Sequence, residues 1–87
     1  MEEIQTVTLN KINNILGNSE IEVFHKVFNK QCIAVAKLPN GFVLSGESAV
    51  VDPRKYDRQI GQEMAIDDIK HKLWELEGYL LQDKLDN

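Results

Sequence analysis

Three basic side chains stand close together where a helix is expected to begin. Arg54, Lys55 and Arg58 belong to the run PRKYDR, which opens with a proline of the kind that favours a first helical turn. The first turn of a helix offers free N–H groups and a partial positive charge, and both suit a phosphate. One hypothesis is therefore a phosphate-bearing small ligand, such as a nucleotide, bound here. Asp52 and Asp57 alternate with the basic residues, so an exposed turn with balanced charges explains the same pattern.

The side chains that most often bind transition metals are scarce in this chain. His25, His71 and Cys32 are the only histidines and cysteine. No two of them have a ligand spacing such as C-x₂-C or H-x₃-H. We therefore predict no metal site and no cofactor, with His25 on a strand and His71 on a helix surface.

The residues that could act in catalysis do not form a known constellation. Gly46 and Ser48 resemble the start of a G-x-S-x-G nucleophile motif, but Val50 stands where the second glycine is needed. Glu75 and Glu77 are two residues apart on an expected helix, so their carboxylates point in different directions. Such carboxylates usually form a solvated face. We predict that the protein is not an enzyme and assign it no catalytic residues.

Composition and charge narrow the possible classes of protein and of binding partner further. The 87-residue chain is 43% hydrophobic and 28% charged, which is typical of one small globular domain. Its net charge of −4 argues against general binding to nucleic acids or anionic membranes. A single cysteine and an acidic start without a signal-peptide pattern predict a cytoplasmic protein. No apolar run approaches the roughly 18 residues that a membrane-spanning helix needs.

The first half of the chain predicts a short helix followed by a β-meander. Residues 1–20 favour a weak helix or a loosely ordered arm, with Thr8 as its cap. Residues 21–28, 32–38 and 42–51 favour strands. Asn40-Gly41 predicts a two-residue type I′ hairpin, which would pair Leu38 with Val43. We expect a bulge or bend at Ser45-Gly46 and a cover on both faces of the sheet.

Residues 52–85 predict one long helix, with a break near Asp57 to Gly61 as an alternative. Projected at about 100° per residue, the helix carries apolar residues along two sides. The first stripe, expected to cover the sheet, consists of Ala65, Ile66, Ile69, Leu73, Leu76 and Leu80. The second consists of Tyr56, Ile60, Met64, Trp74, Leu81 and Leu85, with His71 and Gly78 among them.

The second stripe needs a partner of its own. A helix that is apolar on two sides is usually buried on two sides, and a glycine lets another backbone approach closely. The N-terminal segment or a second copy of the chain could supply the cover. We favour a homo-oligomer, with a dimer as the leading case. The residues predicted to form this interface are Met64, Trp74, Gly78, Leu81 and Leu85.

The stretch from Leu38 to Leu85 resembles a family of small proteins of tailed phages and prophages, with named members from an N4-type and an Sf6-type phage. The matching pieces are Asn40-Gly41-Phe42, Gly46-Glu47-Ser48-Ala49, Val51-Asp52-Pro53, Tyr56, Ile60-Gly61, Ala65 and the closing run Leu73-Trp74-Glu75-Leu76-Glu77-Gly78-Tyr79-Leu80-Leu81. The resemblance implies a phage or prophage accessory protein that acts inside a bacterial host. It implies no activity and supplies no catalytic residues.

These observations predict a single α+β domain with a short N-terminal helix, a three-stranded antiparallel meander and a long amphipathic helix packed on the sheet. The leading hypothesis for function is non-enzymatic: a protein that self-associates and binds a host or phage macromolecule. The alternative is a small-ligand protein that holds a phosphate at Arg54, Lys55 and Arg58.

Overall fold

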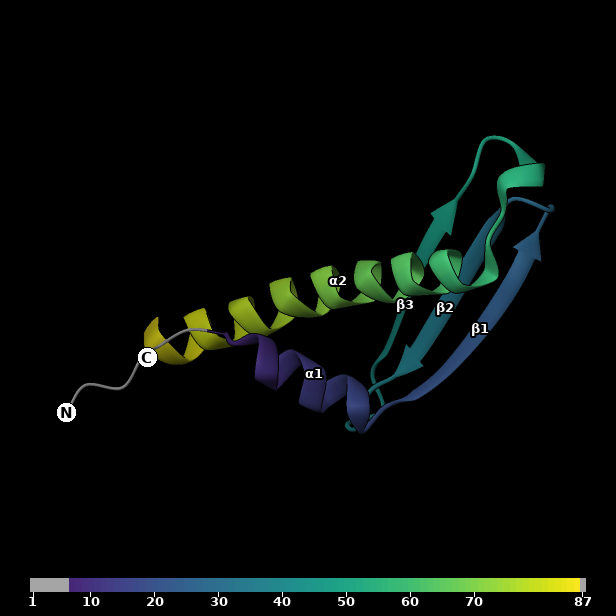
Figure 1. The fold of residues 1–87 in the computed structure, drawn as a ribbon. Coiled ribbons are helices and arrows are strands. Elements are labelled where there is room, and N and C mark those ends of the chain that lie inside the picture. Colours follow the sequence, from purple (N-terminus) through teal and green to yellow (C-terminus); the bar gives the residue numbers. More distant parts are fainter. Residues whose placement is uncertain (1–6, 87) are drawn as a thin grey trace.

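The computed structural model describes residues 7–86. In chain order its elements are α1 (Leu9–Gly17), β1 (Glu20–Val27), β2 (Gln31–Lys37), β3 (Val43–Ala49), the 3₁₀ turn η1 (Pro53–Lys55) and α2 (Arg58–Asp86). The strands form one sheet in the order β1-β2-β3, with both pairs antiparallel, and α2 lies across one of its faces (Figure 1). The predicted α+β architecture is confirmed.

The short helix α1 has the expected cap and buries one side. The hydroxyl of Thr8 accepts a hydrogen bond from the backbone N–H of Lys11 at 3.2 Å. Ile12 and Leu16, four residues apart and therefore on one face, are buried. The part of the predicted helix or arm that falls on residues 1–6 lies outside the described residues.

The β2–β3 hairpin is present, but the predicted turn type and register were wrong. The backbone N–H of Gly41 donates to the carbonyl of Leu38 at 2.8 Å, and that of Leu38 donates to the carbonyl of Phe42 at 2.8 Å. Gly41 has a positive φ of 92°, whereas Asn40 does not, and a type I′ turn needs both. Pro39 favours the second position of a type I turn, which leaves Gly41 as a third, left-handed loop residue.

This extra loop residue moves every pair of the hairpin by one position. Lys37, not Leu38, pairs with Val43, and Ala34 pairs with Gly46. A shift of one residue exchanges the two faces of a strand. The face of β3 that meets the helix therefore carries Leu44, Gly46 and Ser48.

The irregularity of the sheet also lies elsewhere than predicted. Pairing runs without a shift through Ser45 and Gly46, whereas β1 has a bulge between Phe24 and Val27. Gly46 serves a close approach instead: a Cβ placed there would overlap the carbonyl oxygen of Ala65 and lie 2.8 Å from the backbone nitrogen of Ile69. A glycine is needed because α2 crosses β3 at this point.

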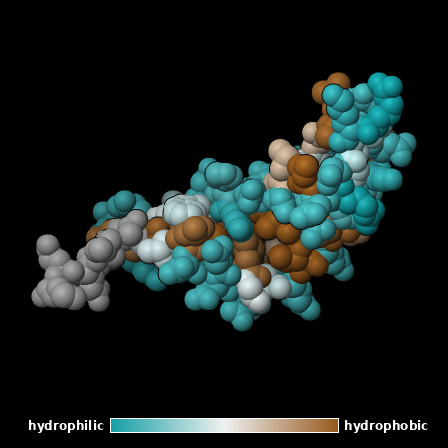
Figure 2. Space-filling view, in the orientation of Figure 1, coloured by the Kyte–Doolittle hydropathy of each residue, from teal (hydrophilic) through white to brown (hydrophobic). Residues whose placement is uncertain are grey.

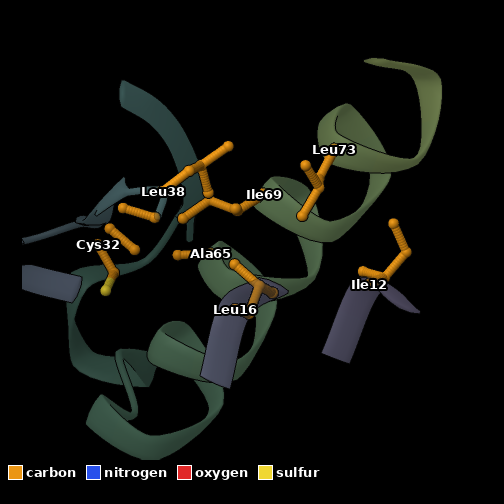
Figure 3. Close-up of a cluster of buried hydrophobic side chains, with 9 residues drawn as sticks. Ile12, Leu16, Cys32, Leu38, Ala65, Ile69 and Leu73 are labelled. Carbon is orange, nitrogen blue, oxygen red and sulfur yellow. The ribbon is translucent and has the colours of Figure 1, made fainter. Parts of the chain in front are cut away.

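The core forms where α1, the sheet and α2 meet (Figure 3). Ala65, Ile69 and Leu73, at intervals of four residues along α2, are buried as the first stripe predicted. The small residues of β2 let the helix approach the sheet closely. The buried residues are Ile12, Leu16, Cys32, Ala34, Ala36, Leu38, Ala65, Ile69 and Leu73.

The helix over residues 52–85 is interrupted at Tyr56 and Asp57. Asp52 caps η1 by accepting from the backbone N–H of Arg54 at 3.0 Å, and Asp57 caps α2 by accepting from that of Ile60 at 3.0 Å. Between them Tyr56 has an extended backbone, with ψ at 123°. This interruption matches the alternative of a once-broken helix.

The helix α2 is longer than the sheet it covers. Its 29 residues span about 43 Å at the α-helical rise, whereas a strand of 7 residues spans about 24 Å. The C-terminal half therefore continues past the sheet, where α1 lies beside it (Figure 1). The Lys11 ammonium and the Glu77 carboxylate, 3.1 Å apart, join the two helices.

Candidate interaction surfaces

The predicted interface residues all lie on α2, and most of them are exposed. Trp74 is 40% exposed, Met64 and Leu85 are exposed, and Leu81 is half-buried beside α1. A Cβ added at Gly78 would meet no atom within 4 Å. Nothing in the described part of the chain therefore requires a glycine here, although an interior helical glycine costs about 1 kcal/mol relative to alanine.

A second apolar surface, which the sequence did not predict, lies where the β2–β3 hairpin meets α2. Leu76 and Leu80 belong to the stripe expected to cover the sheet, yet they are exposed because α2 has passed its edge. Together with Phe42 and Tyr79 they line a shallow apolar hollow over Leu38 and Leu73. Hydrophobic residues interrupt the hydrophilic surface over the middle of the molecule (Figure 2).

Residues 7–86 leave the sheet face opposite α2 open, although we expected a cover on both faces. Phe24 and Val43, on β1 and β3, are 50% and 56% exposed on this face. Ile33 and Val35 lie between them on β2 and are half-buried. Charged side chains share the face, because Glu22 pairs with Val35, Glu20 with Lys37, and Glu47 with Ile33. This face therefore carries apolar and charged side chains side by side.

The basic cluster is partly neutralised by its own carboxylates. The Arg54 guanidinium donates to both oxygens of Asp52, from Nε at 3.1 Å and from Nη2 at 2.9 Å. These bonds hold the pKa of Asp52 below its ordinary value and raise that of Arg54. The carboxylate of Asp57 already occupies the N-terminus of α2. An anion bound at this end of the helix would have to compete with two carboxylates.

A polar contact that sequence reasoning missed lies beside the bulge of β1. The hydroxyl oxygen of Tyr56 is 2.8 Å from Nδ1 of His25 and accepts a longer bond of 3.4 Å from the backbone N–H of Lys26. The pKa of Tyr56 is raised, mainly because burial disfavours the phenolate. The bulge is what turns this part of β1 toward Tyr56, and no periodic pattern in the sequence signals it.

Two other reactive side chains near this contact, those of Ser48 and Cys32, take part in holding the fold together. The hydroxyl of Ser48 donates to the carbonyl of Gly61 at 2.7 Å, and Cys32 is fully buried. Cys32 therefore presents no thiol to solvent, and the hydroxyl proton of Ser48 is used in a hydrogen bond. Within residues 7–86, no group of three or more His, Cys, Asp or Glu side chains is arranged to hold a metal ion.

No helix within residues 7–86 combines the length and the apolar character needed to cross a bilayer.

Comparison with known proteins identifies a family. A family model described as "Phage protein (N4 Gp49/phage Sf6 gene 66) family" matches residues 7–85. The match extends well beyond the resemblance noted from Leu38 onward and includes α1 and β1. No curated protein and no solved structure matches the chain. Because the family model covers nearly the whole sequence, the chain belongs to the N4 Gp49/phage Sf6 gene 66 family of phage proteins.

Proposed function

We propose that this phage protein is a non-enzymatic accessory protein that acts by binding in the cytoplasm of the bacterial host. In this proposal the chain self-associates, as a dimer in the leading case, through the outer face of α2. The assembled protein then binds a host or phage macromolecule, most simply another protein. The net charge of −4 argues against nucleic acid or a membrane as a general target.

The observation that carries self-association is the combination of Trp74 and Gly78 on a helix face that residues 7–86 leave uncovered. Trp74 is 40% exposed, and the space above Gly78 is open. Tryptophan is enriched among the residues that dominate binding energy at interfaces. A neighbouring glycine gives a second helix room to approach. Pairing of this face with another copy would bury the side chain of Trp74 and would place a second helix close to Gly78.

The surface proposed for the macromolecular partner is the open face of the sheet. It combines exposed apolar side chains, Phe24 and Val43, with charged residues around them. Interfaces of transient complexes commonly have an apolar centre and a polar rim. Because this face lies on the side of the sheet away from α2, it stays available when α2 is paired.

The non-enzymatic part of the proposal is supported by the hydrogen bonds and burial of the side chains that could otherwise act in catalysis. Ser48 donates to a helix carbonyl, Cys32 is buried, and Tyr56 is held protonated beside His25. None of these groups has the exposed nucleophile–base geometry that covalent catalysis uses.

Sedimentation equilibrium tests self-association directly. The wild-type chain should sediment as a dimer, and Trp74→Glu should shift it to a monomer by placing a charge in the paired face. Val51→Glu is the matched control, because Val51 is an apolar residue 92% exposed and lies outside α2. A monomeric wild type, or a Trp74→Glu variant that dimerises as tightly as the control, would contradict the proposal.

The alternative, a phosphate-bearing small ligand, is favoured by one observation. Lys55 and Arg58 form no ion pair within the described residues, so their charges are available beside η1. A ligand bound there would raise the melting temperature in proportion to ln(1 + [L]/Kd). Thermal unfolding with and without a panel of nucleotides, on wild type and Arg58→Ala, measures this effect. A shift that disappears in Arg58→Ala supports the alternative, and no shift rejects it.

A further inference from the structure

The outer face of α2 has a regular spacing at its C-terminal end. Trp74, Gly78, Leu81 and Leu85 follow one another at intervals of four, three and four residues. This is the spacing of the contact positions in a two-helix coiled coil. The buried residues Ala65, Ile69 and Leu73 lie on another side of the helix, so the seam formed by residues 74, 78, 81 and 85 is separate from the core.

The seam is complementary to itself when two copies run in opposite directions. If the twofold axis passes between residues 79 and 80, Trp74 lies opposite Leu85 of the partner subunit. Gly78 then lies opposite Leu81 of the partner subunit. Positions 74, 78 and 85 each meet an apolar side chain of the partner subunit, and the fourth, Leu81, meets the open space at Gly78 of the partner subunit.

The residues that flank the seam are complementary in the same arrangement. In an antiparallel pair the flanking positions on one side of the seam face each other across the interface. This places the ammonium of Lys84 of the partner subunit on the side of Glu77, whose side chain is 13% exposed and already forms an ion pair with Lys11 of its own chain at 3.1 Å. On the other side it places Glu75 opposite the amide of Gln82 of the partner subunit. Each facing pair is either oppositely charged or able to form a hydrogen bond.

A parallel pair in register fits less well. In a parallel pair each residue of the seam faces its own copy, so Asp67 would face Asp67 of the partner subunit and Gly78 would face a second glycine. The two sheets would lie side by side at the same end of the paired helices. Like charges that face each other across a helix interface are unfavourable. The antiparallel pair separates the sheets to opposite ends and leaves Asp67 beyond the paired segment.

We propose that two copies of this chain pair in antiparallel fashion along residues 74–85 of α2, with Gly78 receiving Leu81 of the partner subunit. This inference rests on the self-association in the proposed function and adds its geometry. The central two-fold axis lies next to the hollow lined by Val7, Lys11, Glu77 and Lys84, so α1 flanks the paired helices.

Substitution of Gly78 separates the dimer contact from the stability of the single chain. A Cβ at Gly78 meets no atom of the described residues within 4 Å, so Gly78→Gln should fold and should gain helix propensity. In the proposed pair the same side chain occupies the space of the facing leucine, and dimer dissociation should become at least tenfold easier. Gly17→Gln is the matched control, because a Cβ at Gly17 also meets nothing within 4 Å. Equal dimer affinity for both variants would overturn the pairing.

Distances between spin labels report the direction of pairing. Labels would be attached to single cysteines at the exposed positions Gln62 and Gln82, in the full chain with Cys32→Ala. The antiparallel pair predicts about 50 Å between the two labels at position 62 and about 10–20 Å at position 82, from the helical rise and helix spacing. Parallel pairing predicts about 10–20 Å at both positions and would overturn the inference.

The two proposals fail in different ways in these experiments. A dimer with other distances would contradict the antiparallel pairing and leave self-association intact. A wild-type chain that stays monomeric would contradict both.

Discussion

The hydroxyl oxygen of Tyr56 lies 2.8 Å from Nδ1 of His25, across 31 positions of sequence. This hydrogen bond joins the bulged end of β1 to the segment between η1 and α2. Tyr56 stands where the expected long helix is interrupted, so the bond and the interruption belong together.

Removing this hydroxyl should weaken the fold measurably. Tyr56→Phe leaves the ring in place but removes the partner of His25, which should lower the free energy of unfolding by about 1 kcal/mol. Urea denaturation followed by circular dichroism measures the loss. Tyr79→Phe is the control, because Tyr79 is 76% exposed and should change nothing. Equal midpoints for the two variants would show that the bond does not contribute.

The same side chain predicts a loss of stability at alkaline pH. Burial raises the pKa of Tyr56 in the folded state above the value of about 10 in an unfolded chain. A raised pKa gives stability that is present below pH ~10 and is lost as the pH rises through the folded-state value. The difference in urea midpoint between wild type and Tyr56→Phe should therefore be constant from neutral pH to about pH 9.5 and shrink above it. A difference that stays constant to pH 11 would contradict this assignment.

Gly46 should tolerate no side chain. The Cβ of Gly46→Ala would meet backbone atoms of Ala65 and Ile69, which cannot move without displacing α2 from the sheet. We expect a loss of about 3 kcal/mol or more in the free energy of unfolding, at the upper end of the cost of overpacking. Gly17→Ala, with open space around its Cβ, should unfold at the wild-type urea concentration or above it. A stable Gly46→Ala variant would mean that α2 does not pack on β3 as described.

The carboxylate of Asp57 should stabilise the first turn of α2. It accepts from the backbone N–H of Ile60 at 3.0 Å, and loss of such a cap costs about 1 kcal/mol. Asp57→Ala should therefore lower the urea midpoint, whereas Asp67→Ala, an exposed aspartate within the helix, should change it little. Reversal of that order would argue against a helix start at Arg58.

Local patterns in the sequence were enough to predict the elements of this fold. Thr8 as a cap, the β-branched and aromatic residues of the strands, and the spacing of Ala65, Ile69 and Leu73 each act within a few residues, so they can be recognised without the tertiary structure. The turn at Pro39–Gly41 was located correctly. Its register was wrong because the preference of proline for a type I turn outweighed the Asn-Gly pair.

The surfaces could be predicted only in part. The Trp74–Gly78 face follows from the helical projection alone, because it depends on α2 and nothing else. The exposure of Leu76 and Leu80 depends on where α2 leaves the sheet, and this is set by its crossing at Gly46. The His25–Tyr56 contact needs both a bulge in β1 and the break before α2. These are relations between distant segments, which no local pattern contains.

The central claim is that the uncovered face of α2 is buried against a second copy of the chain. Native mass spectrometry of the gently purified protein tests it most directly, because it counts subunits and retained small molecules in one spectrum. We predict a dimer without bound ligand, and a monomer for Trp74→Glu under the same conditions. A bare monomer for the wild type would contradict the claim. A monomer carrying an added mass of nucleotide size would also contradict it and would favour the small-ligand alternative.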